Sequence, residues 1–158
     1  MSAFVHLLSR LFTVEEINGG NLCPTYMYRW RLISTRWFKA YLHRFVEDDW
    51  SLDLHDHPKR FVTIGLRGSY IEQRTPRLAA TGYTREEIYR APWFRSFPAT
   101  HIHRLRLPRD AQGRPIECWT VAIVGRPVRP WGFWHMGRFI PWRRYVHSEI
   151  AGERKACA

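Results

Sequence analysis

Two histidines one residue apart, His55 and His57, are the residues of this chain best suited to chemistry. They lie in Leu54-His55-Asp56-His57-Pro58, and a second segment, Phe97-Pro98-Ala99-Thr100-His101-Ile102-His103, follows later. Alternate residues of a strand point to one face, so both imidazoles can be directed at one point. A third histidine from another strand would complete three neutral nitrogens, a set that suits Fe, Zn, Ni or Cu. The alternative is a strand whose histidines are plain surface polarity.

Tyr70 and Glu72 are candidates for catalysis because they share one face of a predicted strand that follows the Arg67-Gly68 turn. If that face lines a cavity, Glu72 could bind the metal or act as a base. Tyr70 could then donate a hydrogen bond to a bound substrate. The alternative is an outward-facing polar pair.

A neutral metal-binding histidine needs a partner on its other ring nitrogen. Asp53, Asp56 or Glu72 could supply it. On an ideal strand Asp56 points away from the two histidines beside it, so we expect it to be a solvated acid.

Arg104 could bind a substrate carboxylate through two hydrogen bonds, but alternation directs it away from His103. His43 is a further candidate for the cavity wall. The remaining histidines have no matching partner and are expected to be ordinary: His6, His135 and His147.

Hydrophobic periodicity predicts many short strands and little helix. A helix is expected over residues 3–12 and a tight turn at residues 67–68. Residues 74–88 are expected to form mainly a loop, and the last dozen residues a frayed tail. Strands are predicted at 26–33, 37–46, 61–66, 69–73, 88–90, 101–105 and 118–124. This pattern predicts an all-β antiparallel barrel or double-sheet roll with a short N-terminal helix.

Length and composition indicate one globular domain, residues 1–158, with its core at about 20–145. The chain has 158 residues, of which 45% are hydrophobic and 15% aromatic. Its cysteines are three in number, Cys23, Cys118 and Cys157, without a C-x-x-C motif. An odd number argues against a disulfide framework and favours a reducing cytoplasm. No stretch is long and apolar enough to span a bilayer, so no membrane partner is expected.

The formal net charge of +11 would attract nucleic acid or another polyanion. The basic residues are mostly Arg and are spread along the whole chain, which GC-rich coding produces without selection for binding. Nucleic acid therefore stays a secondary alternative as a partner, and a homodimer stays open.

The order of the histidine motifs resembles the cupin superfamily. A cupin's first motif has His-x-His, an acidic ligand four or five residues on, and a glycine about six residues later. Its second has Pro-x-Gly and then a histidine. His55, His57 and Gly68 match the first motif, and Pro98 and His103 the second, with Thr100 in place of the glycine. His101 falls between motif positions, where it would face the substrate or support a ligand.

One position departs from the cupin pattern. The acidic ligand falls on Phe61 or Val62, neither of which binds metal. The resemblance therefore implies a site of three histidines, as in thiol dioxygenases, unless Glu72 supplies the carboxylate. We expect His55, His57 and His103 to be the ligands.

The resemblance implies a cupin-type β-barrel (a jelly roll, or double-stranded β-helix) that binds one divalent metal. Fe(II) is the first expectation for that metal, with Zn, Mn or Ni as alternatives. An Fe(II)-dependent dioxygenase acting on a small polar molecule is the first function hypothesis. A Zn- or Mn-dependent isomerase or hydrolase fits the same site, and a non-catalytic binding module is the third hypothesis.

More narrowly, the chain is similar to small uncharacterised cupin-like proteins of phages and prophages over about residues 20–145. That likeness implies an accessory protein in the host cytoplasm and leaves the activity open. The residues that carry it are 23–26, 42–45, 54–58, 66–72 and 131–133.

Overall fold

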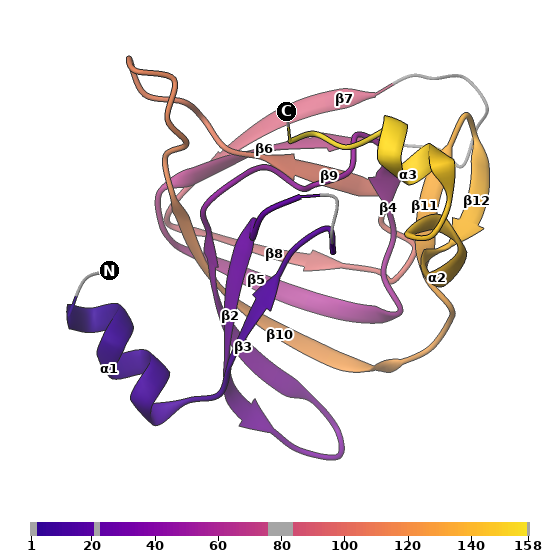
Figure 1. Ribbon diagram of the computed structural model, residues 1–158. Helices are drawn as coiled ribbons and strands as arrows, with labels where there is room; N and C mark the ends of the chain where they lie inside the picture. Colours follow the sequence, from indigo (N-terminus) through magenta and orange to yellow (C-terminus); the bar gives the residue numbers. More distant parts are fainter. Residues whose placement is uncertain (1–2, 21–22, 76–83, 158) are drawn as a thin grey trace.

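Two antiparallel sheets face each other and enclose the interior of the molecule (Figure 1). The computed structural model describes residues 3–20, 23–75 and 84–157. The first six-stranded sheet runs in the order β1 (Val14–Ile17), β2 (Met27–Ser34), β3 (Lys39–Phe45), β10 (Cys118–Pro127), β5 (Lys59–Arg67) and β8 (Trp93–Phe97). The second runs in the order β12 (Arg138–Pro141), β11 (Gly132–His135), β4 (Leu54–His55), β9 (His103–Arg106), β6 (Ser69–Arg74) and β7 (Arg85–Arg90).

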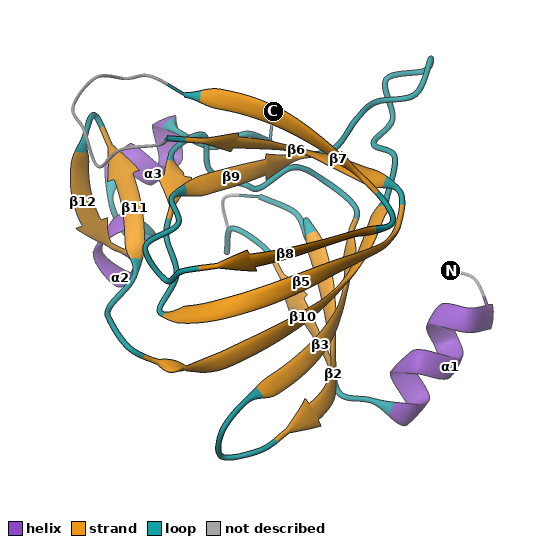
Figure 2. Cartoon of the chain, turned by 180° about the vertical axis from the view of Figure 1, so that it is seen from behind, coloured by secondary structure: helices purple, strands orange, loops and turns teal. Residues whose placement is uncertain are grey.

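The predicted all-β architecture is confirmed, and so is the short N-terminal helix. Helix α1 (Ala3–Leu11) lies outside the first sheet, whereas α2 (Trp142–Tyr145) and α3 (Glu149–Glu153) lie beside the second (Figure 2). The sequence did not predict β1, β8, β11, β12, α2 or α3 as elements. Part of the expected loop at 74–88 belongs to β6 and β7, and its residues 76–83 lie outside the described residues.

Glycine at position 68 makes the passage from the first sheet to the second sharp. Its φ is +79°, which favours glycine, and a side chain there would collide with the carbonyl of Glu117. The predicted turn is therefore confirmed. It carries the chain from β5 into β6, so that Tyr70 and Glu72 enter the interior from the second sheet.

Alternate residues of strand β2 face either helix α1 or the interior of the barrel. Trp30 is fully buried on the outer face, packed with Val5 and Leu8 of α1, and its indole N–H donates to Ser9. Alternation then turns Arg29 inward. A cation thus stands on the interior face because the aromatic face is needed under α1.

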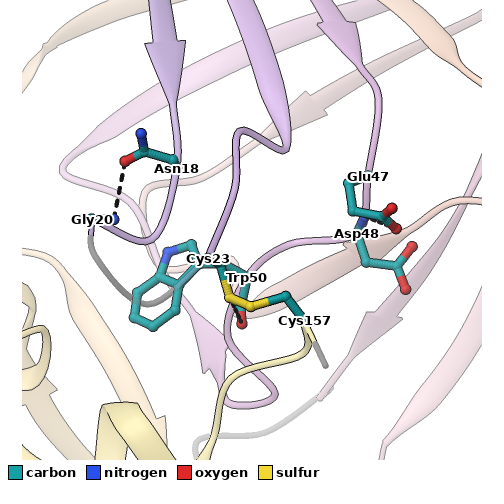
Figure 3. Close-up of a disulfide and its surroundings, with 7 residues drawn as sticks. All are labelled: Asn18, Gly20, Cys23, Glu47, Asp48, Trp50 and Cys157. Carbon is teal, nitrogen blue, oxygen red and sulfur yellow. Dashed lines mark hydrogen bonds between the residues drawn. A yellow bond between two sulfur atoms is a disulfide. The ribbon is translucent and has the colours of Figure 1, made fainter.

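A disulfide joins Cys23 to Cys157, with Cα atoms 5.8 Å apart (Figure 3). The expectation of no disulfide is therefore wrong. The odd cysteine is Cys118, buried in β10, and the pair is 134 residues apart, beyond what local spacing can indicate. The argument from cysteine number for a reducing compartment no longer holds.

The C-terminal segment also differs from the expected frayed tail. Residues 149–153 form α3, Lys155 forms a β-bridge with Ser51, and Cys157 is covalently tied to the start of the barrel. Within the described ranges, no helix has the length and apolarity needed to cross a membrane.

Removing the disulfide should destabilise the fold because it closes a very long loop in the unfolded chain. The double variant Cys23→Ser/Cys157→Ser is expected to lose about 2–4 kcal/mol of unfolding free energy in urea titrations. A reductant should lower the midpoint of the wild type and leave that of the double variant unchanged. Equal stability of oxidised and fully reduced wild type, with reduction verified by thiol titration, would contradict the prediction.

Candidate metal centre

His55, His57 and His103 converge on one point of the interior. His55 is the register partner of His103 across β4 and β9, and His57 follows two residues after His55. One nitrogen from each ring lies within 4.8 Å of the others. The structure thus brings together the three residues that the sequence predicted as ligands.

The spacing of these nitrogens suits a metal ion. The Nε2 atoms of His57 and His103 are 2.8 Å apart. Two nitrogens bound at about 2.0–2.1 Å to one ion, at a right angle, would lie about 3 Å apart. Two ring nitrogens this close need a shared proton or a shared cation between them, and the set fits a divalent metal.

Two histidines of this set, His55 and His57, are held in the neutral form that binds metal. Burial lowers the pKa of His55 to about 4, with the neighbouring His103 acting in the same direction and the carboxylate of Asp49 opposing it. Burial, together with the adjacent histidines, also lowers the pKa of His57 well below its ordinary value. At neutral pH no proton has to leave either ring before a metal binds.

Glu72 contacts His103 at the ring nitrogen that faces away from the other two histidines, and it is not one of the three candidate ligands. Its fully buried carboxylate accepts a hydrogen bond from His103 Nδ1 at 2.7 Å and one from His101 Nε2 at 2.8 Å. The His103 bond occupies Nδ1 and leaves Nε2 facing the other two histidines. Burial acts to raise the pKa of Glu72, but these hydrogen bonds and Arg95 outweigh it and keep the pKa well below its usual range.

A second group of potential ligands, Glu72, His101 and His103, shares His103 with the first. Arg95 already supplies a cation there, with its Nη2 2.8 Å from Glu72 Oε2. A metal ion on the same carboxylate would be repelled by that guanidinium. The three-histidine set is therefore the candidate metal centre, and Glu72, His101 and Arg95 form its supporting network.

The remaining acidic candidates have other partners. Asp49 Oδ2 is 3.8 Å from His55 Nδ1 and accepts a hydrogen bond from the Leu105 N–H at 2.7 Å. The sequence did not predict Asp49 as a neighbour of His55. Asp56, expected to be solvated, is fully buried and accepts the Gly132 N–H at 2.9 Å. That expectation is wrong because β11 packs over the outer side of the motif.

Asp53 does not contact the histidine set. It accepts hydrogen bonds from Tyr145 and Arg154 and lies 3.0 Å from His135 Nδ1. His135 of β11, expected to lack a partner, is therefore paired with Asp53, the residue before β4. Asp53 fastens the C-terminal helices to the barrel.

The metal centre opens onto an internal cavity of about 500 Å³. Phe61, one of the two positions at which the usual cupin acid would fall, lines this cavity, and its ring centroid lies 4.5 Å from that of His57. Tyr70 and the predicted candidate His43 also line it, whereas His101 and Arg104 do not. His101 is thus placed to support Glu72 and not to face a substrate.

Comparison with protein-family models and with curated protein sequences finds no match. Solved structures are similar in fold. An RmlC-like cupin from Shewanella frigidimarina has 14% identity and a TM-score of 0.52, covering 76% of this chain and 87% of its own. The polyketide cyclase RemF from Streptomyces resistomycificus has 12% identity and a TM-score of 0.54, covering 80% and 82%. This is a cupin-type jelly-roll fold.

A third similar structure is that of FeII HppE, with 10% identity and a TM-score of 0.53. The match covers 72% of this chain and 56% of HppE, so the chain spans little more than half of that protein. At these identities the likeness establishes the cupin fold, and the chemistry has to be argued from the residues of this chain.

Each of the three ligand candidates should be needed for metal binding. His55→Ala, His57→Ala and His103→Ala are expected to lower the metal content of the purified protein sharply, while far-UV circular dichroism stays that of a folded β protein. His147→Ala, which changes an exposed histidine, is the matched control and should keep wild-type content. Elemental analysis measures the outcome, and unchanged content in all three variants would refute the assignment.

Glu72 should tune the metal through His103 and not by direct coordination. Glu72→Gln is expected to lower the affinity for Zn²⁺ by about 10–100-fold, the range typical of residues that orient a ligand. A crystal structure of the Zn-loaded wild type separates the two roles. A Glu72 oxygen at about 2.0–2.2 Å from the ion would show direct coordination and contradict the prediction.

Proposed function

We propose that this protein is a metal-dependent cupin that binds one divalent ion through His55, His57 and His103 and acts on a small polar molecule. The observation that carries the proposal is the convergence of three imidazoles, two of them held neutral by burial, on a cavity of about 500 Å³. Cavities of this size and position commonly hold small molecules.

We propose further that the metal is Fe(II) and the reaction a dioxygenation. Three protein nitrogens on one side of an octahedral ion leave about three positions for other ligands. Fe(II), when bound there, supplies the chemistry that activates O2 beside a chelating substrate. The fold likeness to FeII HppE supports this choice of metal.

The chain's own residues would orient the reactants and keep water out. Glu72 fixes the tautomer of His103 and, with His101 and Arg95, holds that ring rigidly. Phe61 and Phe133 pack against His57 and His55 and give the centre an apolar surround. No carboxylate belongs to the three-histidine set, so a bound divalent ion keeps its positive charge and favours an anionic, chelating substrate.

A Zn- or Mn-dependent isomerase or hydrolase is the second candidate, because the same set suits a Lewis acid. The third candidate, a non-catalytic binding module of a phage or prophage acting in the host cytoplasm, rests on the sequence resemblance. The proposal includes no nucleic-acid or homodimer role.

Metal loading followed by O2 uptake tests the proposal. Metal-free protein would be reconstituted with Fe(II), Zn, Mn or Ni and supplied with a panel of small organic acids. We expect O2 consumption that needs Fe(II) and an acid, and at least a tenfold slower rate in His57→Ala. Turnover with Zn or Mn in the absence of O2 would favour the isomerase or hydrolase, and failure to bind any of the four metals would overturn the proposal.

A further inference from the structure

The cavity wall opposite the metal centre carries polar atoms that have no partner within the described part of the chain. They are His43 Nε2, Thr63 Oγ1 and Trp93 Nε1, each buried from solvent. All three residues line the same cavity as His55, His57 and His103. Burying one such atom without a hydrogen bond is unfavourable, and three in one place indicate a surface shaped for a ligand.

These atoms belong to one patch of the first sheet. Register places His43 beside Thr120, Thr120 beside Gly65, and Gly65 beside Trp93, in a single row across four strands. A side chain at Gly65 would collide with the Trp93 indole, so glycine makes room for that ring on the inner face. Thr63 lies two residues along β5. We call His43, Thr63 and Trp93 the polar floor.

The polar floor lies further along the barrel than the metal centre. Phe61, whose ring contacts His57, is two residues before Thr63 and four before Gly65 on β5. At about 3.3 Å per residue, Thr63 is therefore roughly 7 Å beyond the level of the metal, and the Gly65 row roughly 13 Å. The rings of Phe61 and Phe97, register partners on β5 and β8, line the cavity at the level of the metal centre, and Tyr41 and Ala122 line it in the Thr63 row.

The other end of the cavity carries positive charge. Lys59 lines it, one inward position before Phe61, and has no ion-pair partner in the described ranges. Lys39 adds to the positive field that Lys59 experiences, whereas Arg29, which also lines the cavity, is the register partner of His43 and forms an ion pair with Glu15. Asp49 is the acidic residue of the lining, and it is held by the Leu105 N–H. A ligand that enters beside Lys59 and a divalent metal is therefore favoured when it is anionic.

We propose that the polar floor is a second binding subsite, which takes the uncharged hydrogen-bonding end, such as a hydroxyl or carbonyl, of an elongated organic acid. The carboxylate of that acid lies at the Lys59 end, and its apolar middle packs on the aromatic wall. The placement of the carboxylate beside the metal rests on the proposed function, whereas the polar floor stands on the structure alone.

The side chains of the polar floor are uncharged, and Arg29 beside His43 is already paired with Glu15, so the floor favours an uncharged group of the ligand. Burial, reinforced by the charge of Arg29, lowers the pKa of His43 to about 3, so its imidazole is uncharged at neutral pH. The Trp93 indole can only donate, and the Thr63 hydroxyl can donate or accept. A hydroxyl group of the ligand can accept from the indole and donate to the imidazole or the threonine.

Binding of three matched probes to the Zn-loaded protein tests the subsite. The probes are 3-(4-hydroxyphenyl)propanoate, 3-phenylpropanoate, which lacks the hydroxyl, and 3-(4-hydroxyphenyl)propanamide, which lacks the charge. Calorimetry is expected to give the hydroxylated acid at least a fivefold lower Kd than either analogue, as expected when a buried hydrogen bond or charge contact is lost.

The variants then locate each contact. Thr63→Val and His43→Phe keep the shape of the wall and should bring the hydroxylated acid close to the Kd of 3-phenylpropanoate. Lys59→Gln should weaken both acids and leave the amide unchanged. Thr13→Val, at an exposed threonine outside the cavity, is the control and should bind as the wild type does.

Equal binding of the hydroxylated and unsubstituted acids, loss of discrimination in none of the floor variants, or no binding of any probe would overturn the subsite. Zinc content is measured on every sample. Failure of the proposed function would appear as a protein that binds no metal, and this outcome is separate from the dependence of probe affinity on His43 and Thr63.

Discussion

The buried carboxylate of Glu72 is the interaction on which the site depends. It is fully removed from solvent, yet it is anionic because His101 and His103 donate hydrogen bonds to it and Arg95 forms an ion pair with it. Removing one partner of such a buried network leaves an uncompensated charge, which is strongly destabilising. The network therefore fixes β6, β8 and β9 relative to one another, and with them the direction of the His103 ring.

The position of the acid explains the departure from the cupin motif. Phe61 or Val62 stands where the resemblance expects the acidic ligand, and Phe61 packs on His57, whereas the carboxylate of Glu72 enters from β6 and accepts a hydrogen bond from His103 Nδ1. The candidate metal centre thus consists of three imidazoles without a carboxylate, while the Glu72 anion can still raise the basicity of His103. An apolar ring on one side and a buried acid on the other make the centre both dry and rigid.

The two sheets contribute different residues to the wall of the cavity. The second sheet and the segment after β4 present the histidines and Glu72, and the first sheet presents the unpartnered polar atoms of the floor and the charge of Lys59. The disulfide and the contacts of Asp53 close the end of the barrel with the C-terminal helices. Buried polar atoms without hydrogen-bond partners in the described residues lower the stability of the fold. The disulfide and the contacts of Asp53, which lie away from the polar floor, stabilise the fold.

The sequence by itself determined the strand-rich fold, the N-terminal helix, the turn at Gly68 and the three histidines, because alternation, helical periodicity and glycine's conformational freedom are local. Only the tertiary structure decided that Glu72 supports His103, that Asp56 is buried and that Asp49 approaches His55, since each contact joins different strands. The disulfide between Cys23 and Cys157 is likewise invisible to spacing, because chain topology brings its two ends together. Position along the chain fixed which side chains face inward, and the packing of two sheets fixed which of them meet.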